Sequence, residues 1–409
     1  MDRIARQNLI HRAESFGRDE LERRRTEYKF AHLAKVEAFA WDLELYGQLQ
    51  KQFNEHIILK GGAAAQLFFP VHLQRNSVDI DVITDLTSEE FEEGLRAITE
   101  RLCPGGAVCT FKKYVPEQPR DGLRFTRYTV EVPSVCTAEE GYGRKDPTVQ
   151  TLNVDVLFGT LPKDHFIEKS TATFALNLDF APRVSAPDAL FGDKLLTLAV
   201  TTVGIPDARA ADRCKQLYDL HRLVDLDHLR DAAQIQESFK LVMETQRQIR
   251  GQEAVSLADA VIDVDEFLQK ARLLDFHDPL VLWQALRAFQ SNFVGVDARM
   301  QRETWVIGIE MIRLLVEGLL AQQGGSAVEP LGLLKRAREL ERAIEGIALE
   351  GSDAERKVEH VKKLQEKLIG FCQSKKIKAG PLRGRSPRRM FWYLVRQENI
   401  DELYALLNG

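Results

Sequence analysis

The chain has 409 residues, of which 44% are hydrophobic and 29% are charged, and its formal net charge is −5. This composition is typical of a soluble globular protein long enough for two or three domains, and it excludes a chain-wide basic character that would attract nucleic acid. No run of about 18 apolar residues occurs, and the first residues lack the apolar core of a signal peptide. We therefore expect a cytoplasmic protein with no membrane contact. The five cysteines lack the spacing of metal ligands, and we expect reduced thiols at Cys103, Cys109, Cys136, Cys214 and Cys372.

The first half of the chain divides into two parts by pattern. Residues 1–50 are highly charged, and their apolar residues recur at helical spacing, which predicts a helical extension. Residues 51–185 alternate between strand and helix patterns. A helix is predicted over Ser88–Leu102, with Ser88 as its N-cap. Five strands are predicted, at 56–59, 78–84, 107–115, 123–132 and 151–158.

Three aspartates stand on two of these predicted strands. Successive side chains of a strand point to opposite faces, so Asp79 and Asp81 share the face opposite to their apolar neighbours, and Asp155 has the same position in the later strand. One such acid is usually a solvated strand edge. If the two strands are neighbours, however, three carboxylates can hold two Mg²⁺ ions, the arrangement used for in-line attack on a nucleoside triphosphate.

Other residues accompany these acids along the chain. Lys60, Gly61 and Gly62 precede them, and bare backbone amides at a helix N-terminus can meet phosphate oxygens, although the glycines could simply end a strand. Arg75 could pair with an acid or steer a phosphate. Further on, Lys194 stands in a helix that follows Pro187, where a lysine is usually solvated.

The chain is predicted to be helical from residue 186 onward, with a break at 322–326. The last part, 326–409, contains a basic segment at 374–389 with seven cations and no acid, followed by Trp392 and Tyr393. Cations beside aromatic residues suit RNA, whose phosphates and bases they can bind. The alternative is a solvated loop with the aromatics buried. The predicted nucleic-acid contacts are Arg383, Arg385, Arg388 and Arg389.

The order of these motifs resembles a known family. Lys60-Gly61-Gly62 followed by Arg75-x-Ser77-x-Asp79-x-Asp81 is similar to the opening of the polymerase-β-like nucleotidyltransferases, and more closely to the AbiEii/AbiGii toxin branch, which includes the MenT toxins. A Lys194-Leu195 helix and the segment Lys215-Gln-Leu-Tyr-Asp219-Leu also fit. The resemblance covers roughly residues 55 to 225.

Two departures from the family pattern are visible. Ala63 stands where the family often has Thr or Ser, and Gln216 stands where it usually has an acid. Asp212 lies one helical turn before Gln216 and could substitute for that acid.

The resemblance implies an α+β fold, with a polymerase-β-like nucleotidyltransferase domain followed by a mostly α-helical C-terminal region. It places the catalytic domain at 51–185 and a helical domain that completes the nucleotide site at 186–325. It implies two Mg²⁺ ions on Asp79, Asp81 and Asp155, which are also the catalytic residues. The implied nucleotide-binding residues are Lys60, Gly61, Gly62, Arg75, Ser77, Lys194, Asp212, Lys215 and Asp219.

The implied reaction transfers a nucleoside monophosphate from an NTP to an acceptor. In the resembled branch the acceptor of some members is the 3′ end of tRNA, and a cognate antitoxin usually accompanies the toxin. Two alternatives stay open. The acceptor could be a hydroxyl of a protein or small molecule, or the chain could be a non-catalytic regulator with a degenerate nucleotide site.

Overall fold

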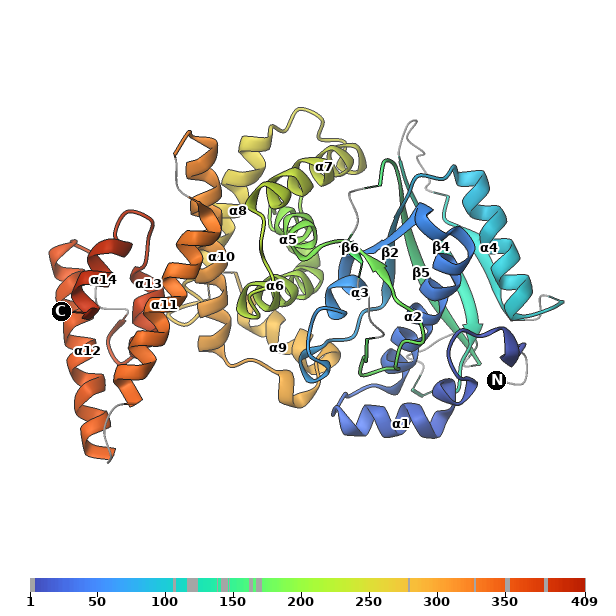
Figure 1. The fold of residues 1–409 in the computed structure, drawn as a ribbon, viewed down its shortest axis with the longest axis horizontal. Helices are drawn as coiled ribbons and strands as arrows, with labels where there is room; N and C mark the ends of the chain where they lie inside the picture. Colours follow the sequence, from blue (N-terminus) through green and yellow to red (C-terminus); the bar gives the residue numbers. More distant parts are fainter. Residues whose placement is uncertain are drawn as a thin grey trace.

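The architecture comes from a computed structural model that describes residues 4–105, 108–115, 124–137, 139–140, 146, 148–161, 165–166, 171–278, 280–326, 329–349, 354–378 and 382–408. A mixed β-sheet with its covering helices forms one end of the molecule, and the chain then continues through helices to the opposite end (Figure 1). This confirms the predicted α+β class with a helical C-terminal region.

The sheet has seven strands in the order β3-β4-β5-β2-β1-β7-β6. The strands are β1 (Ile57–Lys60), β2 (Asp79–Thr84), β3 (Thr110–Lys113), β4 (Phe125–Pro133), β5 (Val149–Phe158), β6 (His165–Phe166) and β7 (Arg183–Val184). The central strands β2 and β5 are parallel neighbours, whereas β1 and β4 flank them in antiparallel orientation. All five predicted strands form, although residues 107 and 123, which begin two of the predicted ranges, lie outside the described residues. The strands β6 and β7 were not predicted, because two residues are too short for an alternating pattern.

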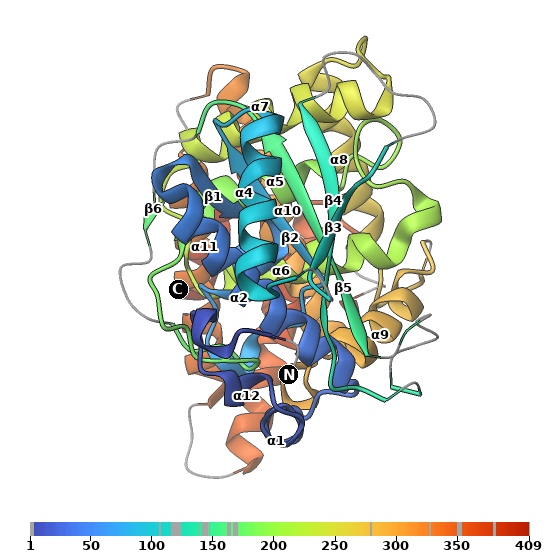
Figure 2. The same cartoon turned by 90° about the vertical axis from the view of Figure 1, so that its right-hand side faces the viewer.

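One face of this sheet is buried under helices. Ile80 and Val82 of β2 and Val154 of β5 are fully buried, as the alternation predicts. They pack in one hydrophobic core with residues of α2 (Leu33–Phe53) and α4 (Ser88–Leu102), and Figure 2 shows α4 in front of the sheet. The N-cap of α4 is Thr87, whose side chain and that of Glu90 form a capping box, so the helix is capped one residue before the predicted Ser88.

The N-terminal part is helical, as predicted, and consists of α1 (Arg18–Glu27) and α2. The helix α2 continues to Phe53, and nearly every one of its side chains is buried. The proposed division of the chain into four domains stays a prediction.

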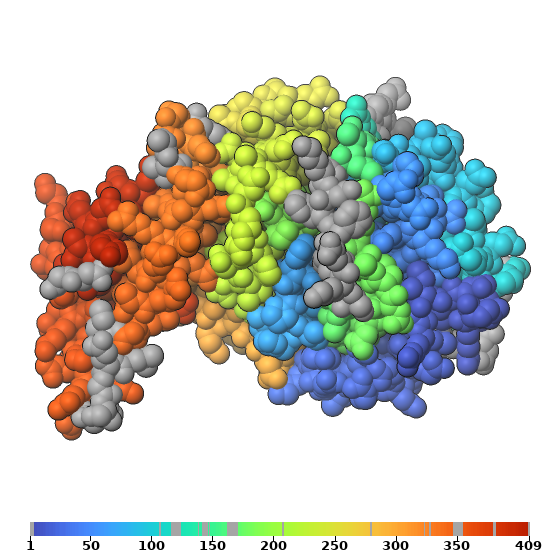
Figure 3. Space-filling model, viewed as in Figure 1, coloured from blue at the N-terminus to red at the C-terminus, as the bar shows by residue number. Residues whose placement is uncertain are grey.

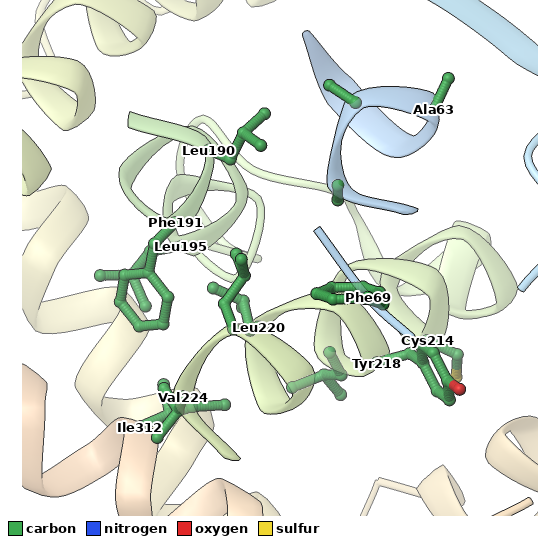
Figure 4. Packing of buried hydrophobic residues seen from close by; sticks show 14 of the residues in the cluster. Ala63, Phe69, Leu190, Phe191, Leu195, Cys214, Tyr218, Leu220, Val224 and Ile312 are labelled. Atoms are coloured by element: carbon green, nitrogen blue, oxygen red, sulfur yellow. The ribbon is translucent and has the colours of Figure 1, made fainter. Parts of the chain in front are cut away.

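The remaining helices follow the sheet in chain order. They are α3 (Gly61–Gln66), α5 (Pro187–Leu196), α6 (Ala210–Asp225), α7 (Ala232–Arg250), α8 (Leu257–Ala271), α9 (Leu282–Phe293), α10 (Arg302–Gln323), α11 (Pro330–Leu349), α12 (Ala354–Ser374), α13 (Pro387–Leu394) and α14 (Ile400–Asn408). In Figure 4, Phe191 and Leu195 of α5 face Leu220 of α6, and Ile312 of α10 lies beside Val224. These apolar contacts fix α5 and α6 relative to each other. Helices α11 to α14 form the end of the molecule farthest from the sheet (Figure 3).

The cysteines differ from expectation at one place. The structure joins Cys103 and Cys109 in a disulfide, because the chain turns back after α4 toward β3 and brings their Cα atoms to 5.6 Å. The prediction that all five thiols are reduced is therefore wrong for this pair, whereas Cys136, Cys214 and Cys372 are buried thiols outside any disulfide. Within the described part of the chain, no helix is long and apolar enough to cross a membrane.

Candidate active site

A cleft of about 790 Å³ lies between the open face of the sheet and the helices α5, α6 and α7. It collects nearly all of the residues predicted to be catalytic or to bind the nucleotide. The predicted site residues that line it are Lys60, Gly61, Gly62, Arg75, Ser77, Asp79, Asp81, Asp155, Lys194, Asp212 and Lys215. Only Asp219 of that set is missing from the lining, because it lies behind the wall of the cleft.

Four charged side chains form a row across the floor of the cleft. The strand register places Arg127 of β4 opposite Asp155 of β5, Asp155 opposite Asp81 of β2, and Asp81 opposite Lys60 of β1. The charges along the row are therefore positive, negative, negative and positive. Adjacent strands lie about 4.8 Å apart, so the two carboxylates in the middle are direct neighbours of like charge.

Burial and mutual repulsion affect the carboxylates in and around this row. Burial and then the carboxylate of Asp155 raise the pKa of Asp81 to about 7. Asp79 accepts a hydrogen bond from Asn153 Nδ2 at 2.9 Å. On α2, Asp42 is fully buried with no hydrogen-bond partner for either carboxylate oxygen in the described structure, and burial, followed by Asp79 and Asp81, raises its pKa well above the ordinary value.

The glycine turn makes room for the acids. Gly61 has a φ of +70°, and a Cβ atom there would stand 1.9 Å from Asp81 Oδ2. A side chain at Gly62 would meet Ser77 Oγ at 2.7 Å. Glycine is therefore required at residue 61 both for the backbone conformation and for the approach of the carboxylate.

At the other end of the row, Lys60 is paired with an acid of α5. Lys60 Nζ lies 3.1 Å from Asp193 Oδ2 of α5. Although burial alone lowers it, Asp193 and Asp81 raise the pKa of Lys60 above its ordinary value. Asp193 is one of the site residues that the sequence did not single out, and no spacing in the sequence signals its contact with β1.

A buried ion cluster stands behind the cleft and holds Lys194. Asp219 is completely buried, and its carboxylate accepts from Arg75 Nε at 2.9 Å and from Lys194 Nζ at 2.9 Å. Burial alone would raise the pKa of Asp219, but Arg75 and Lys194 lower it below the ordinary value. Lys194 also donates to Gln216 Oε1 at 3.0 Å. Asp219 is thus buried behind the cleft and positions Lys194, which corrects its predicted direct contact with the nucleotide. Arg75 lines the cleft, and its nucleotide contact stays a prediction.

Asp212 does not substitute for the acid that is missing at Gln216. Its carboxylate pairs with Arg209 at 2.6 Å and with Lys215 at 3.1 Å. The amide of Gln216 itself accepts from Lys194, so this position keeps its contact with the lysine without a charge.

The helical wall of the cleft is basic. Arg209, Lys215 and Arg250 line it, and Nε of Arg250 is buried with no hydrogen-bond partner among the described residues. Burial and the charge of Arg209 lower the pKa of Arg250. Tyr114, which is 60% exposed, and Phe125 lie on the sheet side of the same cleft. Arg127, Arg209 and Arg250 were missed because they come from segments without a recognisable motif.

The acids suit a hard divalent cation in part. Asp79 and Asp81 offer carboxylate oxygens, and burial together with the neighbouring carboxylate of Asp155 raises the pKa of Asp81. Both oxygens of Asp155, however, accept from Arg127 at 2.6 Å. Within the described ranges, no three His, Cys, Asp or Glu side chains already converge as a metal site. The donor set fits Mg²⁺ once Asp155 is released.

Part of the basic C-terminal segment is held by acids, although Lys375, Lys376, Lys378 and Arg383 are exposed. Arg389 is completely buried and pairs with Asp275 at 2.9 Å, and Arg388 pairs with Glu341 of α11 at 2.5 Å. Burial alone would raise the pKa of Glu310 on α10, but a cluster of arginines that includes Arg389 lowers it to about 2.

The neighbours of these arginines are occupied as well. Arg385 donates to the backbone oxygen of Asp275, and the buried Trp392 donates to Glu341. The prediction for Arg389 is therefore wrong, because its side chain is buried. Arg385 and Arg388 are half-exposed and help to hold α13 against the helices around it, and their nucleic-acid contacts stay predictions. Arg383 is exposed.

Comparison with known proteins agrees with the geometry. The family model described as nucleotidyl transferase AbiEii toxin, type IV TA system, matches residues 45–291. The chain belongs to the AbiEii family. A search of curated proteins finds no match. Among solved structures, a candidate nucleotidyltransferase from H. pylori is 16% identical, with a TM-score of 0.36 over 68% of this chain and 94% of that chain.

The family assignment makes this chain a nucleotidyltransferase of the kind found in toxin–antitoxin systems. The departure of this AbiEii protein at Ala63 has little bearing on the cleft, because Ala63 is buried in the hydrophobic core (Figure 4). The departure at Gln216 is compensated by its contact with Lys194. Both features that favoured a degenerate site therefore have a structural explanation that leaves the cleft intact.

Proposed function

We propose that this AbiEii protein transfers a nucleoside monophosphate from an NTP to a hydroxyl of a nucleic acid, most specifically the 3′ end of tRNA, and that a cognate antitoxin restrains it. The observation that carries the proposal is the charge of the cleft. Seven cationic and five acidic side chains line it among the described residues, although the whole chain has a net charge of −5. A net positive cleft around an acid pair suits polyanionic substrates.

The residues divide into two groups by role. Lys194, held by Asp219 and Gln216, and Lys60, held by Asp193, offer fixed positive charges to the triphosphate. Such preorganised charges need no rearrangement when negative charge builds up on the leaving group. The amides around Gly61 and Gly62 are the remaining predicted phosphate contacts.

The transfer itself is a displacement at the α-phosphorus. The acceptor oxygen forms a bond to that phosphorus, the bond to the bridging oxygen of the β-phosphate breaks, and pyrophosphate leaves. The proton of the acceptor hydroxyl passes to a carboxylate of the acid row. Mg²⁺, held by Asp79, Asp81 and Asp155, would supply charge neutralisation of the triphosphate and activation of the acceptor hydroxyl.

The acceptor side of the proposal rests on the helical wall. Arg209 and Arg250 lie on this wall, and the buried Nε of Arg250 donates no hydrogen bond within the described structure. Tyr114 and Phe125 provide aromatic faces across the cleft. Cations that follow a backbone together with aromatics that stack on bases are the usual means of binding single-stranded nucleic acid. This wall takes over the role first assigned to the C-terminal basic segment.

The proposal is tested by incubating the purified protein with Mg²⁺, total tRNA and each of the four NTPs labelled at the α-phosphate. We expect label to enter tRNA from at least one NTP, and none with Asp81→Asn. Expression of the wild type, but not of Asp81→Asn, should arrest growth. Label that enters only the protein itself or a small molecule would refute the nucleic-acid acceptor, and no transfer to any acceptor would refute the enzymatic role.

The acceptor wall is tested separately. Arg250→Gln should raise the Michaelis constant for tRNA and flatten its dependence on salt, because one phosphate contact is lost. Arg383→Gln is the matched control, since Arg383 is an exposed arginine outside the cleft. Equal effects of the two substitutions would remove Arg250 from the acceptor site.

A further inference from the structure

Arg127 is paired with Asp155, the third of the three carboxylates that are predicted to bind metal ions. Its Nε and Nη2 atoms donate to the two oxygens of Asp155, each at 2.6 Å. The two residues stand directly opposite each other on β4 and β5. Such a bidentate pair uses both carboxylate oxygens, and a guanidinium does not lose its proton in proteins. The guanidinium therefore blocks one acceptor site on each oxygen of Asp155, and its positive charge competes with a metal ion or an acceptor proton for this carboxylate.

The environment of the pair permits that movement. The side chain of Arg127 is 42% exposed, whereas that of Asp155 is 11% exposed. Arg127 lines the cleft, and Asp155 is the one side chain that its guanidinium contacts in the described structure. The guanidinium can leave Asp155 by rotation into the cleft without disturbing the hydrophobic core on the other face of the sheet.

The charge balance of the row favours an exchange. With Arg127 in place, the row of Arg127, Asp155, Asp81 and Lys60 has equal numbers of positive and negative charges. A divalent cation bound by the two acids would add two positive charges to the row and would repel the guanidinium of Arg127. The arginine then needs a new anion, and a phosphate group is the anion that a nucleotidyl transfer brings into this cleft.

We propose that Arg127 is an exchangeable counter-ion: it holds Asp155 in the free protein, gives up Asp155 to a divalent cation, and moves to a phosphate of the bound substrate. This inference rests on the proposed function for the phosphate donor, but the first half, competition for Asp155, concerns the free protein alone. Arg127 is thus a positioning residue that links substrate binding to completion of the acid site.

The competition predicts opposite effects of one substitution. Arg127→Gln removes the counter-ion, so the nucleotide-free protein should bind Mn²⁺ on the order of tenfold more tightly, as expected when one charge-assisted pair no longer competes. The same variant should bind a non-hydrolysable triphosphate analogue more weakly. A residue that only stabilised the strand would weaken both. Mn²⁺ binding is measured by electron paramagnetic resonance, without any transfer reaction.

Two controls keep the test decisive. Arg209→Gln removes a cation from the same cleft whose partner is Asp212, and it should leave Mn²⁺ affinity unchanged. Arg127→Lys keeps the charge but loses the bidentate geometry, and its Mn²⁺ affinity should lie between those of the wild type and Arg127→Gln. If Arg127→Gln does not fold, as judged by circular dichroism, the lysine variant carries the measurement.

The source of the phosphate is decided by adding ligands to the Mn²⁺ titration. If the triphosphate analogue narrows the difference in Mn²⁺ affinity between wild type and Arg127→Gln, the arginine moves to the nucleotide. If only an RNA oligonucleotide narrows it, the arginine moves to the acceptor. No narrowing by either ligand overturns the transfer to phosphate.

The primary measurement keeps this inference separate from the proposed function. If Arg127→Gln binds Mn²⁺ with the affinity of the wild type, the counter-ion exchange is overturned, even when the wild type transfers nucleotide. If Arg127→Gln binds Mn²⁺ more tightly but the wild type transfers nothing, the competition for Asp155 is supported and the proposed function is refuted.

Discussion

Asp219 is expected to be the acid on which the stability of the site region depends most. It is completely buried and is the shared counter-ion of Arg75 and Lys194, which are themselves almost completely buried. Asp219→Asn removes the charge but keeps the shape, and it leaves two buried cations without compensation. Gln66, which also donates to this carboxylate at 3.1 Å, keeps an oxygen to bind in the variant.

The expected cost follows from the burial of these charges. Removing one partner of a buried ion pair typically costs about 3–5 kcal/mol, because the remaining charge can neither be solvated nor paired. That is a large part of the 5–15 kcal/mol that is roughly the stability of a domain. Asp212→Asn is the matched control. Its carboxylate also pairs with two cations on α6 and the turn before it, but its side chain is 31% exposed, and we expect a loss below about 1 kcal/mol.

The free energies of unfolding are measured by urea titration at pH 7, followed by circular dichroism. A second variant isolates the cause: adding Lys194→Met to Asp219→Asn removes one of the stranded cations and should recover part of the loss. If Asp219→Asn costs no more than Asp212→Asn, the buried cluster does not stabilise the fold. If the second substitution deepens the loss, the cost does not come from uncompensated charge.

Three further predictions concern other parts of the structure. Because the pKa of Asp42 is raised in the folded state, ionisation of Asp42 should lower the free energy of unfolding as the pH rises above about 4. Relative to the wild type, Asp42→Asn should therefore gain up to about 1.4 kcal/mol of stability per pH unit in urea titrations from pH 5 to 8, and parallel curves would contradict this. Gly61→Ala should abolish transfer by displacing Asp81, with activity at the wild-type level as the contrary result. Arg389→Met should lower the melting temperature by several degrees, whereas Arg383→Met should leave it unchanged, and equal shifts would show that burial of Arg389 is unimportant.

The pattern of the sequence was sufficient to predict which face of the sheet the three aspartates take. Alternation along β2 and β5 fixes which face each aspartate takes, since a shift by one residue would expose Ile80 and Val154. The parallel pairing of Asp81 with Asp155 then follows if the two strands are neighbours. Their adjacency itself came from the resemblance, because alternation says nothing about the order of strands in a sheet.

The cations of the site could not be predicted in the same way. Arg127 stands on a strand with no motif, and its role depends on the register between β4 and β5. Arg389 shows the opposite error. A basic run was interpreted as a surface, but the acid that pairs with the buried Arg389 comes from a distant segment that holds Asp275. Partners that are far apart in sequence leave no local signal.

Two cations of the cleft, Lys194 and Arg127, differ in how firmly they are held, and this difference suggests an order of events. Lys194 is buried and tied to Asp219 and Gln216, so its charge is in place before any ligand arrives. Arg127 is half-exposed and has a single partner within the described structure. A triphosphate can therefore dock on a fixed charge while the third carboxylate is still closed. Arg127 competes with a metal ion for Asp155. A metal ion that arrives alone meets this competition in full. A metal ion that arrives with its nucleotide does not, because the nucleotide offers the arginine a phosphate.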